Sequence, residues 1–424
     1  MELVNKLIWA VAVSFLFLSS IYFTFKLRFV QFRLFKVLSC LKTEKSHNDI
    51  SAKDSLIMSL SSKIGVGSLA GIAFAIYYGG LGSVFWIWVV TFLTSINCFV
   101  ENILATIYKK VDNNGCQGGP FYYIRYGLKK EKLAFLYAIL AIVSYSTGFI
   151  AIQNNTMVSL IGDMYNINIV IVSFVITILS CFVFLKGIKT VSNLCNKIFP
   201  IMMFMYLFIG LIVLVKNISF IPELFLNIFY SAFDVKSISG GFLYVMLIGI
   251  QKGIFQTEVG VGTSAMISGV SSNIDFIKQG NTGIVSTYFI GFIVSFVTTL
   301  IIATSGYGMF SSMNGIELTK YAFNYHFGYI GEVLLLIILV LFAFSTIITV
   351  YYYALSNLKG LTNKKLLINI LKIVTVLSLF VGGIVSSYVV WRTIDIFVGL
   401  LTIINTYSIF MLKDVVVKRV RSSN

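Results

Sequence analysis

The chain has 424 residues, of which 58% are hydrophobic and only 11% are charged, and its formal net charge is +16. A water-soluble protein of this length needs far more charge to cover its surface, so the composition excludes a soluble globular protein. The low proline count (3) and the 38 phenylalanines fit long apolar helices that end at charged loops. The sequence therefore predicts a polytopic all-α membrane protein, whose basic residues must be placed relative to the bilayer before nucleic acid is considered as a partner.

Eleven stretches are apolar and long enough to cross a bilayer, which takes about 20 helical residues. In chain order they are residues 7–25, 54–78, 82–107, 133–153, 167–185, 194–215, 241–270, 283–303, 331–355, 366–387 and 393–412. The first stretch has one lysine ahead of it and no small-residue cleavage site, which favours a membrane helix over a cleaved signal peptide. We therefore expect about 11 transmembrane helices.

The distribution of Lys and Arg over the connections predicts the orientation of the chain. Of the 32 basic residues, 25 fall on one side of the predicted spans, five on the other side and two within spans. Because cytoplasmic connections carry the excess of basic residues, we expect a plasma-membrane protein with its N-terminus outside and its C-terminus in the cytoplasm. The basic surface then faces the cytoplasm and the anionic lipid bilayer, and nucleic acid is not an expected partner.

Two of the predicted spans are interrupted at mid-depth. Lys63, Gly65 and Gly67 interrupt the second span, and residues 251–263, which include Glu258, interrupt the seventh. Each glycine costs a helix about 1 kcal/mol relative to alanine. Five spans separate the two interruptions, so the interrupted spans run in opposite directions, which is the sequence signature of an inverted-repeat secondary transporter. The alternative is that the glycines only allow close packing between helices.

Several motifs resemble the alanine/glycine:cation symporter family, the sodium:alanine symporters. The longest is IGVGSLAGIAFAIYYGGLGSVFWIW at residues 64–88, which is similar to the glycine-rich signature of that family. Shorter similar motifs are GGPFYYI at 118–124, QNNT at 153–156, GIFQTEVGVG at 253–262 and FAFST at 342–346. Their order is intact from about Gln31 to Tyr353, so the resemblance covers most of the chain.

The resemblance implies a LeuT-type fold, a 5+5 inverted repeat preceded by one peripheral helix. The implied divisions are a peripheral transmembrane helix at 1–25, a cytoplasmic interfacial segment at 26–53, the first repeat at 54–215, an extracellular connection at 216–240, the second repeat at 241–412 and a basic cytoplasmic tail at 413–424. It also implies sodium-coupled symport of small neutral amino acids, alanine or glycine, by alternating access, with no cofactor besides the coupling ion.

The resemblance further implies two binding sites at the interruptions. The substrate carboxylate would meet the backbone at Gly65 and Gly67, and the other implied substrate residues are Ser68, Gln153, Asn155, Phe255 and Thr257. A sodium ion would be bound by the carbonyl oxygens of Ser61 and Ile64 and by the hydroxyls of Ser345 and Thr346. Such a set of hard oxygen donors suits an alkali cation better than a transition metal.

Some positions depart from the family pattern. Ser68 stands where the family has asparagine, and Gln256 and Thr257 replace its Ser-Asn pair. Ile290 stands where the family has an isoleucine followed by an acid that is lost here, and Val350 stands where it has a tryptophan. Because several of these positions adjoin the expected pocket, the resemblance implies the transport class without fixing the amino acid that is carried.

Four ionisable residues lie inside predicted spans, where charge is costly unless it faces protein or water: Lys63, Glu101, Lys252 and Glu258. Glu258 could accept hydrogen bonds from unwound backbone or tune cation affinity. Glu101 and Lys252 could act in gating or ion pairs, or could extend to the membrane surface. Lys63 could be a tethered ammonium that makes transport proton-linked or sodium-independent, or its side chain could reach the cytoplasmic vestibule.

The leading prediction is therefore a symporter, with two alternatives. One is the same fold with proton coupling or a different amino acid, and the other is a channel or a membrane protein that binds without transport. A channel would be expected to carry rings of charge or repeated filter motifs, which the sequence lacks. His47 and His326 fall on opposite sides of the membrane, and no P-loop or paired CxxC is present, so we predict neither an enzyme, an ATP-driven pump nor a metal site other than sodium.

Overall fold

The computed structural model describes residues 2–33, 50–112, 115–184, 188–234, 241–272, 275–306, 313 and 315–422. These residues are mostly helical, and the strands among them form one antiparallel hairpin, β1 (Lys110–Asp112) with β2 (Gly115–Gln117). The predicted all-α class is therefore confirmed. Residues 34–49 of the predicted interfacial segment, with His47, lie outside the described residues.

The elements of the first half precede a second, similarly long set. The first set is α1 (Glu2–Lys26), η1 (Val30–Phe32), α3 (Ala52–Lys63), η3 (Val66–Ser68), α4 (Ala70–Gly79), α5 (Gly82–Ile107), α6 (Pro120–Tyr122), η4 (Tyr123–Gly127), α7 (Glu131–Val143), η5 (Ser144–Gly148), α8 (Phe149–Tyr165), α9 (Ile169–Phe184) and α10 (Ile188–Lys216). The second set is η6 (Ile218–Phe220), α11 (Ile221–Phe233), α12 (Gly241–Thr257), α13 (Thr263–Ser268), α14 (Phe276–Tyr288), η8 (Phe289–Val294), α15 (Ser295–Ala303), α16 (Ile316–Phe327), α17 (Tyr329–Leu361), α18 (Lys365–Ile384), α19 (Ser387–Met411) and α20 (Lys413–Ser422).

Eight helices of the described chain are long and apolar enough to cross a membrane, or nine when the bent pair α3 and α4 counts as one span. Each of the eleven predicted stretches coincides with helix. However, α9 is shorter than a full membrane crossing, and α12 and α13 form a broken pair, so the number eleven stays a prediction. What is confirmed is a multi-pass membrane protein.

The outer surface of the helices is apolar. Phe182 of α9, Phe204 of α10 and Leu366 of α18 are 72%, 70% and 70% exposed. On a soluble monomer, large exposed apolar patches mark interaction or aggregation sites, whereas here they face the bilayer. Polar residues lie inside instead, as expected where lipid is the solvent.

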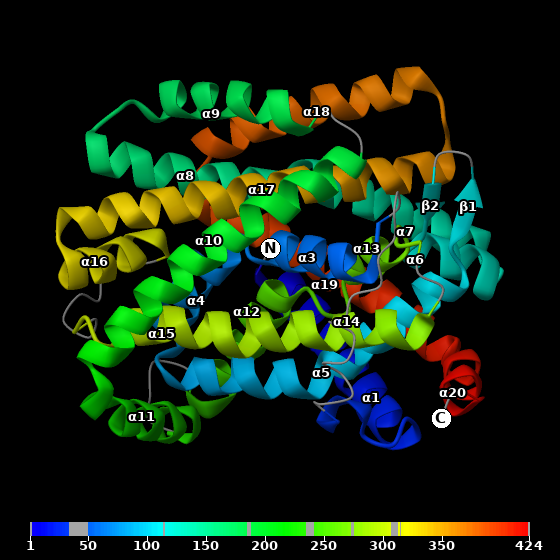
Figure 1. Cartoon of the computed structure of the whole chain (residues 1–424), viewed down its shortest axis with the longest axis horizontal. Helices are drawn as coiled ribbons and strands as arrows, with labels where there is room; N and C mark the ends of the chain where they lie inside the picture. Colours follow the sequence, from blue (N-terminus) through cyan, green and yellow to red (C-terminus); the bar gives the residue numbers. More distant parts are fainter. Residues whose placement is uncertain are drawn as a thin grey trace.

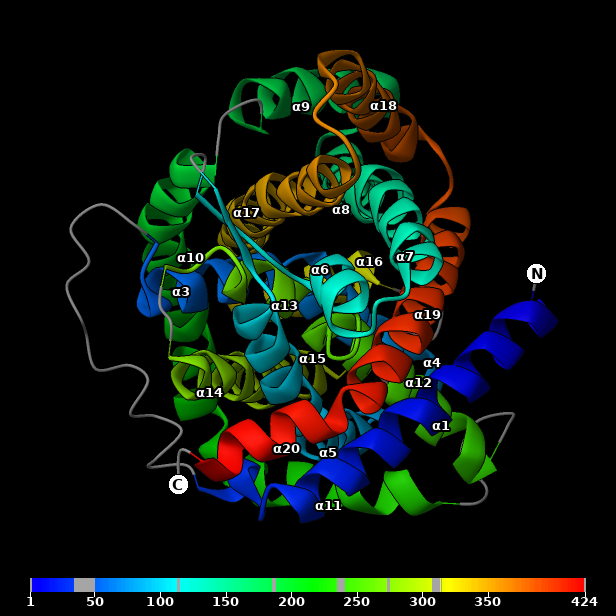
Figure 2. The ribbon, with the colours of Figure 1, turned by 90° about the vertical axis from the view of Figure 1, so that its right-hand side faces the viewer.

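The two interrupted helices lie at the centre of the molecule. Figure 1 shows α3, α4, α12 and α13 in the middle, with α17 on one side and α14 and α5 on the other. Figure 2 shows α9 and α18 together outside α8 and α17. At the opposite edge, α1 packs against α5 and α19. Both breaks are therefore surrounded by protein.

Helices also form outside the predicted spans. The predicted connection at 216–240 contains α11, whose residues Leu224, Ile228 and Ala232, spaced four apart, are buried on one face. The predicted tail at 413–424 contains α20, with Val416 and Val420 buried. Apolar residues at helical spacing cover a partner even where a segment is too short or too charged to span a bilayer.

Candidate functional site

The first break separates α3 from α4. The helix α3 ends at Lys63, Gly65 is extended at φ −104° and ψ −158°, and the short turn η3 leads into α4. Side chains from distant helices bond the released backbone groups. The Val66 N–H donates to Oε1 of Gln153 at 3.2 Å, and Oγ1 of Thr298 donates to the Ser68 carbonyl at 2.7 Å. The break is thus stabilised by α8 and α15 rather than by its own helix.

The second break separates α12 from α13 and reverses the backbone with left-handed residues. Glu258, Gly260 and Gly262 have φ values of 53°, 81° and 97°. Glycine adopts this region freely, whereas a glutamate there is uncommon and strained. The Gly260 carbonyl accepts a hydrogen bond from Asn405 at 2.9 Å, and the Val261 carbonyl accepts one from the Tyr137 hydroxyl at 2.8 Å. These bonds satisfy carbonyls that the broken helix leaves without partners.

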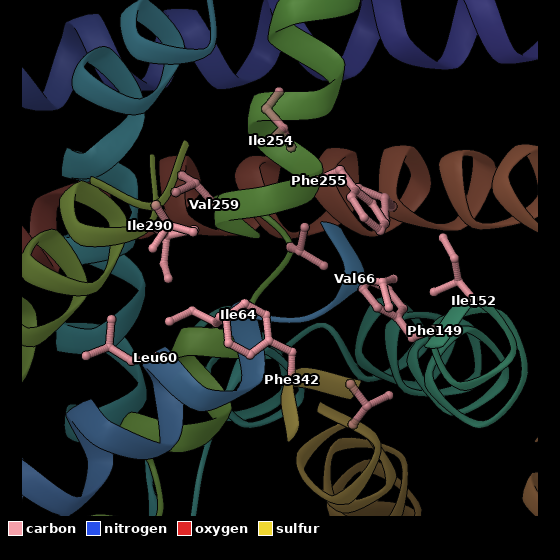
Figure 3. Close-up of a cluster of buried hydrophobic side chains, with 14 of the residues drawn as sticks. Leu60, Ile64, Val66, Phe149, Ile152, Ile254, Phe255, Val259, Ile290 and Phe342 are labelled. Carbon is pink, nitrogen blue, oxygen red and sulfur yellow. The ribbon is translucent and has the colours of Figure 1, made fainter. Parts of the chain in front are cut away.

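The two breaks face each other at the glycines. A Cβ on Gly67 would lie 2.9 Å from the Phe255 ring, and a Cβ on Gly65 would lie 2.8 Å from Oγ1 of Thr346 and 3.0 Å from Oε1 of Gln153. Figure 3 shows Val66 near Phe149 and Phe255, and those two rings stack with centroids 6.1 Å apart. The structure therefore brings four of the predicted substrate residues, Gly65, Gly67, Gln153 and Phe255, to one place.

Three other predicted substrate residues are placed differently. Asn155 donates to the carbonyls of Gly382 at 2.9 Å and Val385 at 2.8 Å, which ties α8 to the end of α18. Residues two apart on a helix point about 200° apart, so Asn155 cannot share the face of Gln153. The geometry does not support its prediction as a pocket residue. The Thr257 hydroxyl bonds to Gly253 of its own helix, and Ser68 is buried at the first break.

The predicted cation ligands meet between α3 and α17. Oγ of Ser345 lies 3.0 Å from the Ser61 carbonyl oxygen, and Oγ1 of Thr346 lies 3.1 Å from the Ser62 carbonyl oxygen. Ser62 is a fourth converging oxygen that the sequence analysis did not include. Ile64 is buried at the end of α3. Two released carbonyls and two hydroxyls are hard donors, so the residues present fit an alkali cation.

Lys63 points away from that cluster. Its side chain is 3% exposed, and Nζ lies 3.1 Å from Oγ of Ser286 on α14 and 3.8 Å from Sγ of Cys98 on α5. The interpretation that Lys63 reaches a cytoplasmic vestibule is not supported, because the ammonium is enclosed by protein. It also does not lie at the contact between Ser61 and Ser345.

Glu101 and Lys252 are buried as well, so neither extends to the membrane surface. Oε1 of Glu101 accepts a hydrogen bond from Asn405 at 2.9 Å. Nζ of Lys252 lies 3.4 Å from both carboxylate oxygens of Asp395 and 4.8 Å from the centre of the Trp391 ring. The sequence analysis missed Asp395, although an acid inside the predicted span 393–412 is a signal by itself.

The fold and the buried polar site define a multi-pass membrane protein with two interrupted helices that meet at its centre. The chain belongs to the sodium:alanine symporter family, which it matches over residues 1–423. The resemblance found in the motifs is thereby confirmed, and the family is one of transporters rather than enzymes.

Curated relatives span nearly the whole chain. It is 31% identical over 417 residues to the amino-acid carrier protein AlsT of Bacillus subtilis, covering 98% of this chain and 89% of that protein. It is 31% identical over 418 residues to the probable sodium/glutamine symporter GlnT of the same organism, covering 97% and 87%. It is 29% identical over 437 residues to the sodium/alanine symporter AgcS of Methanococcus maripaludis, covering 99% and 96%.

Proposed function

We propose that this chain is a sodium-coupled symporter of a small neutral amino acid, alanine or glycine, with a LeuT-type inverted repeat that works by alternating access. Membership of the family and the name of the archaeal relative, sodium/alanine symporter, support this function. The observation that carries it is the meeting of the two helix breaks at Gly67 and Phe255. Paired breaks of this kind bind substrate and ion in inverted-repeat transporters.

The first break supplies the donor for a substrate carboxylate. The N–H of Val66 is exchangeable in its partner, because it is held by a neutral side-chain amide, Oε1 of Gln153. A carboxylate oxygen is a stronger acceptor, since charge-assisted hydrogen bonds are roughly twice as strong as neutral ones. The substrate carboxylate would replace the Gln153 oxygen on this N–H, near the positive end of α4.

The rings around the break limit the size of the substrate side chain. Phe255 lies against Gly67, stacks with Phe149 and packs 5.2 Å from Trp391 between ring centroids. An apolar enclosure of this kind accepts a methyl group or a hydrogen more readily than a long polar chain. Glutamine is the competing substrate, because the glutamine symporter and the amino-acid carrier are equally similar to this chain.

Sodium would bind where α3 meets α17. The two carbonyl–hydroxyl contacts there join the first repeat to the second. A cation at that point would be bound by groups from both repeats, so its binding would favour the state in which α3 and α17 are close. A ligand shifts a conformational equilibrium only through such a difference in affinity, which is the basis of coupling.

We also propose that the protein lies in the plasma membrane with its N-terminus outside and its C-terminus in the cytoplasm. The excess of Lys and Arg on one side of the spans supports this orientation. It places Lys252 and Asp395 in the extracellular half and the connection between α17 and α18 on the cytoplasmic side.

The test is uptake by the purified chain in liposomes. Labelled alanine, glycine and glutamine are offered separately under an inward sodium gradient, an inward proton gradient or no gradient. We expect alanine or glycine to accumulate above equilibrium with sodium alone. Accumulation of glutamine alone would replace the substrate, accumulation with protons alone would replace the coupling ion, and equilibration without accumulation would contradict symport.

Variants of α17 test the cation site. Ser345→Ala removes a predicted ligand and should raise the sodium concentration for half-maximal uptake at least tenfold. The matched control is Thr349→Ala, one turn away, whose hydroxyl bonds only to carbonyls of its own helix among the described residues. Equal sodium dependence in both variants would contradict the proposed site.

A further inference from the structure

We propose that the ammonium of Lys63 is a built-in cation that fills a second cation-binding position, formed by α5, α14 and the connection between α12 and α13. Removal of Lys63 should then create a site for an external alkali cation at this position. The proposal adds to the proposed function, but its test measures ion binding and does not depend on transport.

The position of Lys63 is distinct from the predicted sodium site. Ser61 and Ser62 direct their carbonyls to α17, whereas the Lys63 ammonium contacts Ser286 of α14 and Cys98 of α5. In Figure 1, α17 lies on one side of α3, and α14 and α5 lie on the other. A cation bound at Ser345 and the ammonium of Lys63 would therefore occupy opposite sides of the same helix.

The surroundings of the ammonium demand positive charge. The charge of Lys63 acts electrostatically on two buried carboxyl groups, Glu101 of α5 and Glu258 of the second break. Within the described residues, Oε2 of each of these glutamates has no hydrogen-bond partner. Burying carboxylates without compensation is very costly, so a cation is needed near both of them.

The ammonium is shared between these carboxylates rather than paired with one of them. In the part of the chain that the structure describes, Lys63 forms no ion pair within 4 Å, and its nearest oxygen is Oγ of Ser286 at 3.1 Å. The hydroxyls of Ser264 and Thr287 lie beside Cys98. Carboxylate and hydroxyl oxygens around a central positive charge form the donor set that an alkali cation uses.

Lys63 therefore supplies by covalent attachment what a dissociable ion would otherwise supply. If its ammonium is removed, Glu101 and Glu258 keep their negative charge demand, and space is left at the end of a four-carbon side chain. A sodium ion is small enough to enter such a space and would restore the charge balance. The wild-type chain should then bind one sodium ion, and Lys63→Ala should bind two.

The experiment is equilibrium binding of radioactive sodium to the purified full chain in lipid nanodiscs, without substrate. Four proteins are compared: the wild type, Lys63→Ala, Ser345→Ala and the double variant. We expect the number of bound ions to double in Lys63→Ala, to fall to none in Ser345→Ala and to be one in the double variant. Lys63→Arg keeps the charge and should bind as the wild type does.

The outcomes separate this proposal from the proposed function. If the wild type binds no sodium but Lys63→Ala gains one ion, sodium coupling fails and the built-in cation is supported. If Lys63→Ala gains none while it elutes as the wild type does in gel filtration, the proposal is overturned. If Lys63→Ala does not fold, Ser345→Ala decides alone: a sodium ion still bound beside an intact Lys63 overturns the proposal, and complete loss supports it.

Discussion

The ammonium of Lys252 on α12 lies 3.4 Å from both carboxylate oxygens of Asp395 on α19, and both side chains are buried. The same ammonium lies 4.8 Å from the centre of the Trp391 ring, which packs against Phe74 of α4 and Phe255 of α12. Because Phe255 also covers Gly67, the ion pair and the ring of Trp391 close one end of the helix break. In the proposed orientation this is the extracellular end.

We predict that this ion pair locks the extracellular side. Lys252→Met leaves Asp395 buried without its partner, and breaking a buried pair in this way costs about 3–5 kcal/mol. Uptake should fall more than tenfold, and the melting temperature in detergent should drop. Exchanging the two charges in Lys252→Asp with Asp395→Lys should restore part of both quantities. Uptake at the wild-type level in Lys252→Met would show that the pair has no part in transport.

An exposed ion pair provides the matched control. Lys320 of α16 pairs with Asp163 of α8, and the Asp163 side chain is 54% exposed. Exposed ion pairs contribute about 0–1 kcal/mol, because water and salt screen them. Lys320→Met should therefore leave uptake and melting temperature within error of the wild type, and a loss comparable to that of Lys252→Met would point to a general effect of removing positive charge.

The approach of Phe255 to Gly67 predicts the effect of a single methyl group. Gly67→Ala would place its Cβ 2.9 Å from the Phe255 ring, and overpacking of this kind costs about 1–3 kcal/mol. We expect uptake to be lost while Gly67→Ala with Phe255→Leu recovers part of it. The control is Gly71→Ala on α4, whose Cβ would meet Trp391 at an ordinary 3.6 Å. Equal uptake by Gly67→Ala and Gly71→Ala would contradict the close approach.

Apolar runs predicted the helices well where lipid or apolar protein surrounds them. The stretch 82–107 coincides with α5, Gly82–Ile107. The fourth stretch was predicted to end at 153, whereas the helix continues to Tyr165. The polar residues Asn154, Asn155 and Thr156 suggest an end, but they are buried against other helices. Hydropathy measures preference for lipid, so it fails where a membrane helix presents polar groups to protein.

The site was predictable only as far as its motifs. The glycines at 65 and 67 and the break at Glu258 follow from sequence, because each disrupts a helix locally. The partners of the buried charges do not, since Asp395 lies 143 residues from Lys252 and Asn405 lies 304 residues from Glu101. Pairing over such distances depends on how the helices pack, which a single sequence does not encode in any local pattern.

Asn405 is predicted to hold the second break together. Its Nδ2 lies 2.9 Å from both Oε1 of Glu101 and the Gly260 carbonyl, and its Oδ1 accepts a hydrogen bond from Tyr123. Asn405→Ala leaves these groups buried without their partner, which costs about 1–3 kcal/mol for each group. The melting temperature should fall clearly more than in Ser408→Ala, whose hydroxyl bonds to its own helix. Equal melting temperatures would contradict the bridging role.

The orientation is tested with single cysteines at exposed positions. Ile167 in the connection between α8 and α9 and Tyr325 of α16 are 43% and 60% exposed, and Lys364 between α17 and α18 is exposed. The positive-inside distribution places the first two outside and Lys364 in the cytoplasm. Native Cys98 and Cys195 are buried and can stay, whereas the other three cysteines are replaced by serine.

Each variant is treated in intact cells with a maleimide that does not cross membranes, and then again after permeabilisation. Ile167→Cys and Tyr325→Cys should react in intact cells, whereas Lys364→Cys should react only after permeabilisation. The reverse pattern would invert the protein and move the pair of Lys252 and Asp395 to the cytoplasmic end, so that the lock would control release of substrate instead of entry. Labelling of all three in intact cells would contradict the predicted odd number of spans between Lys364 and the two outer positions.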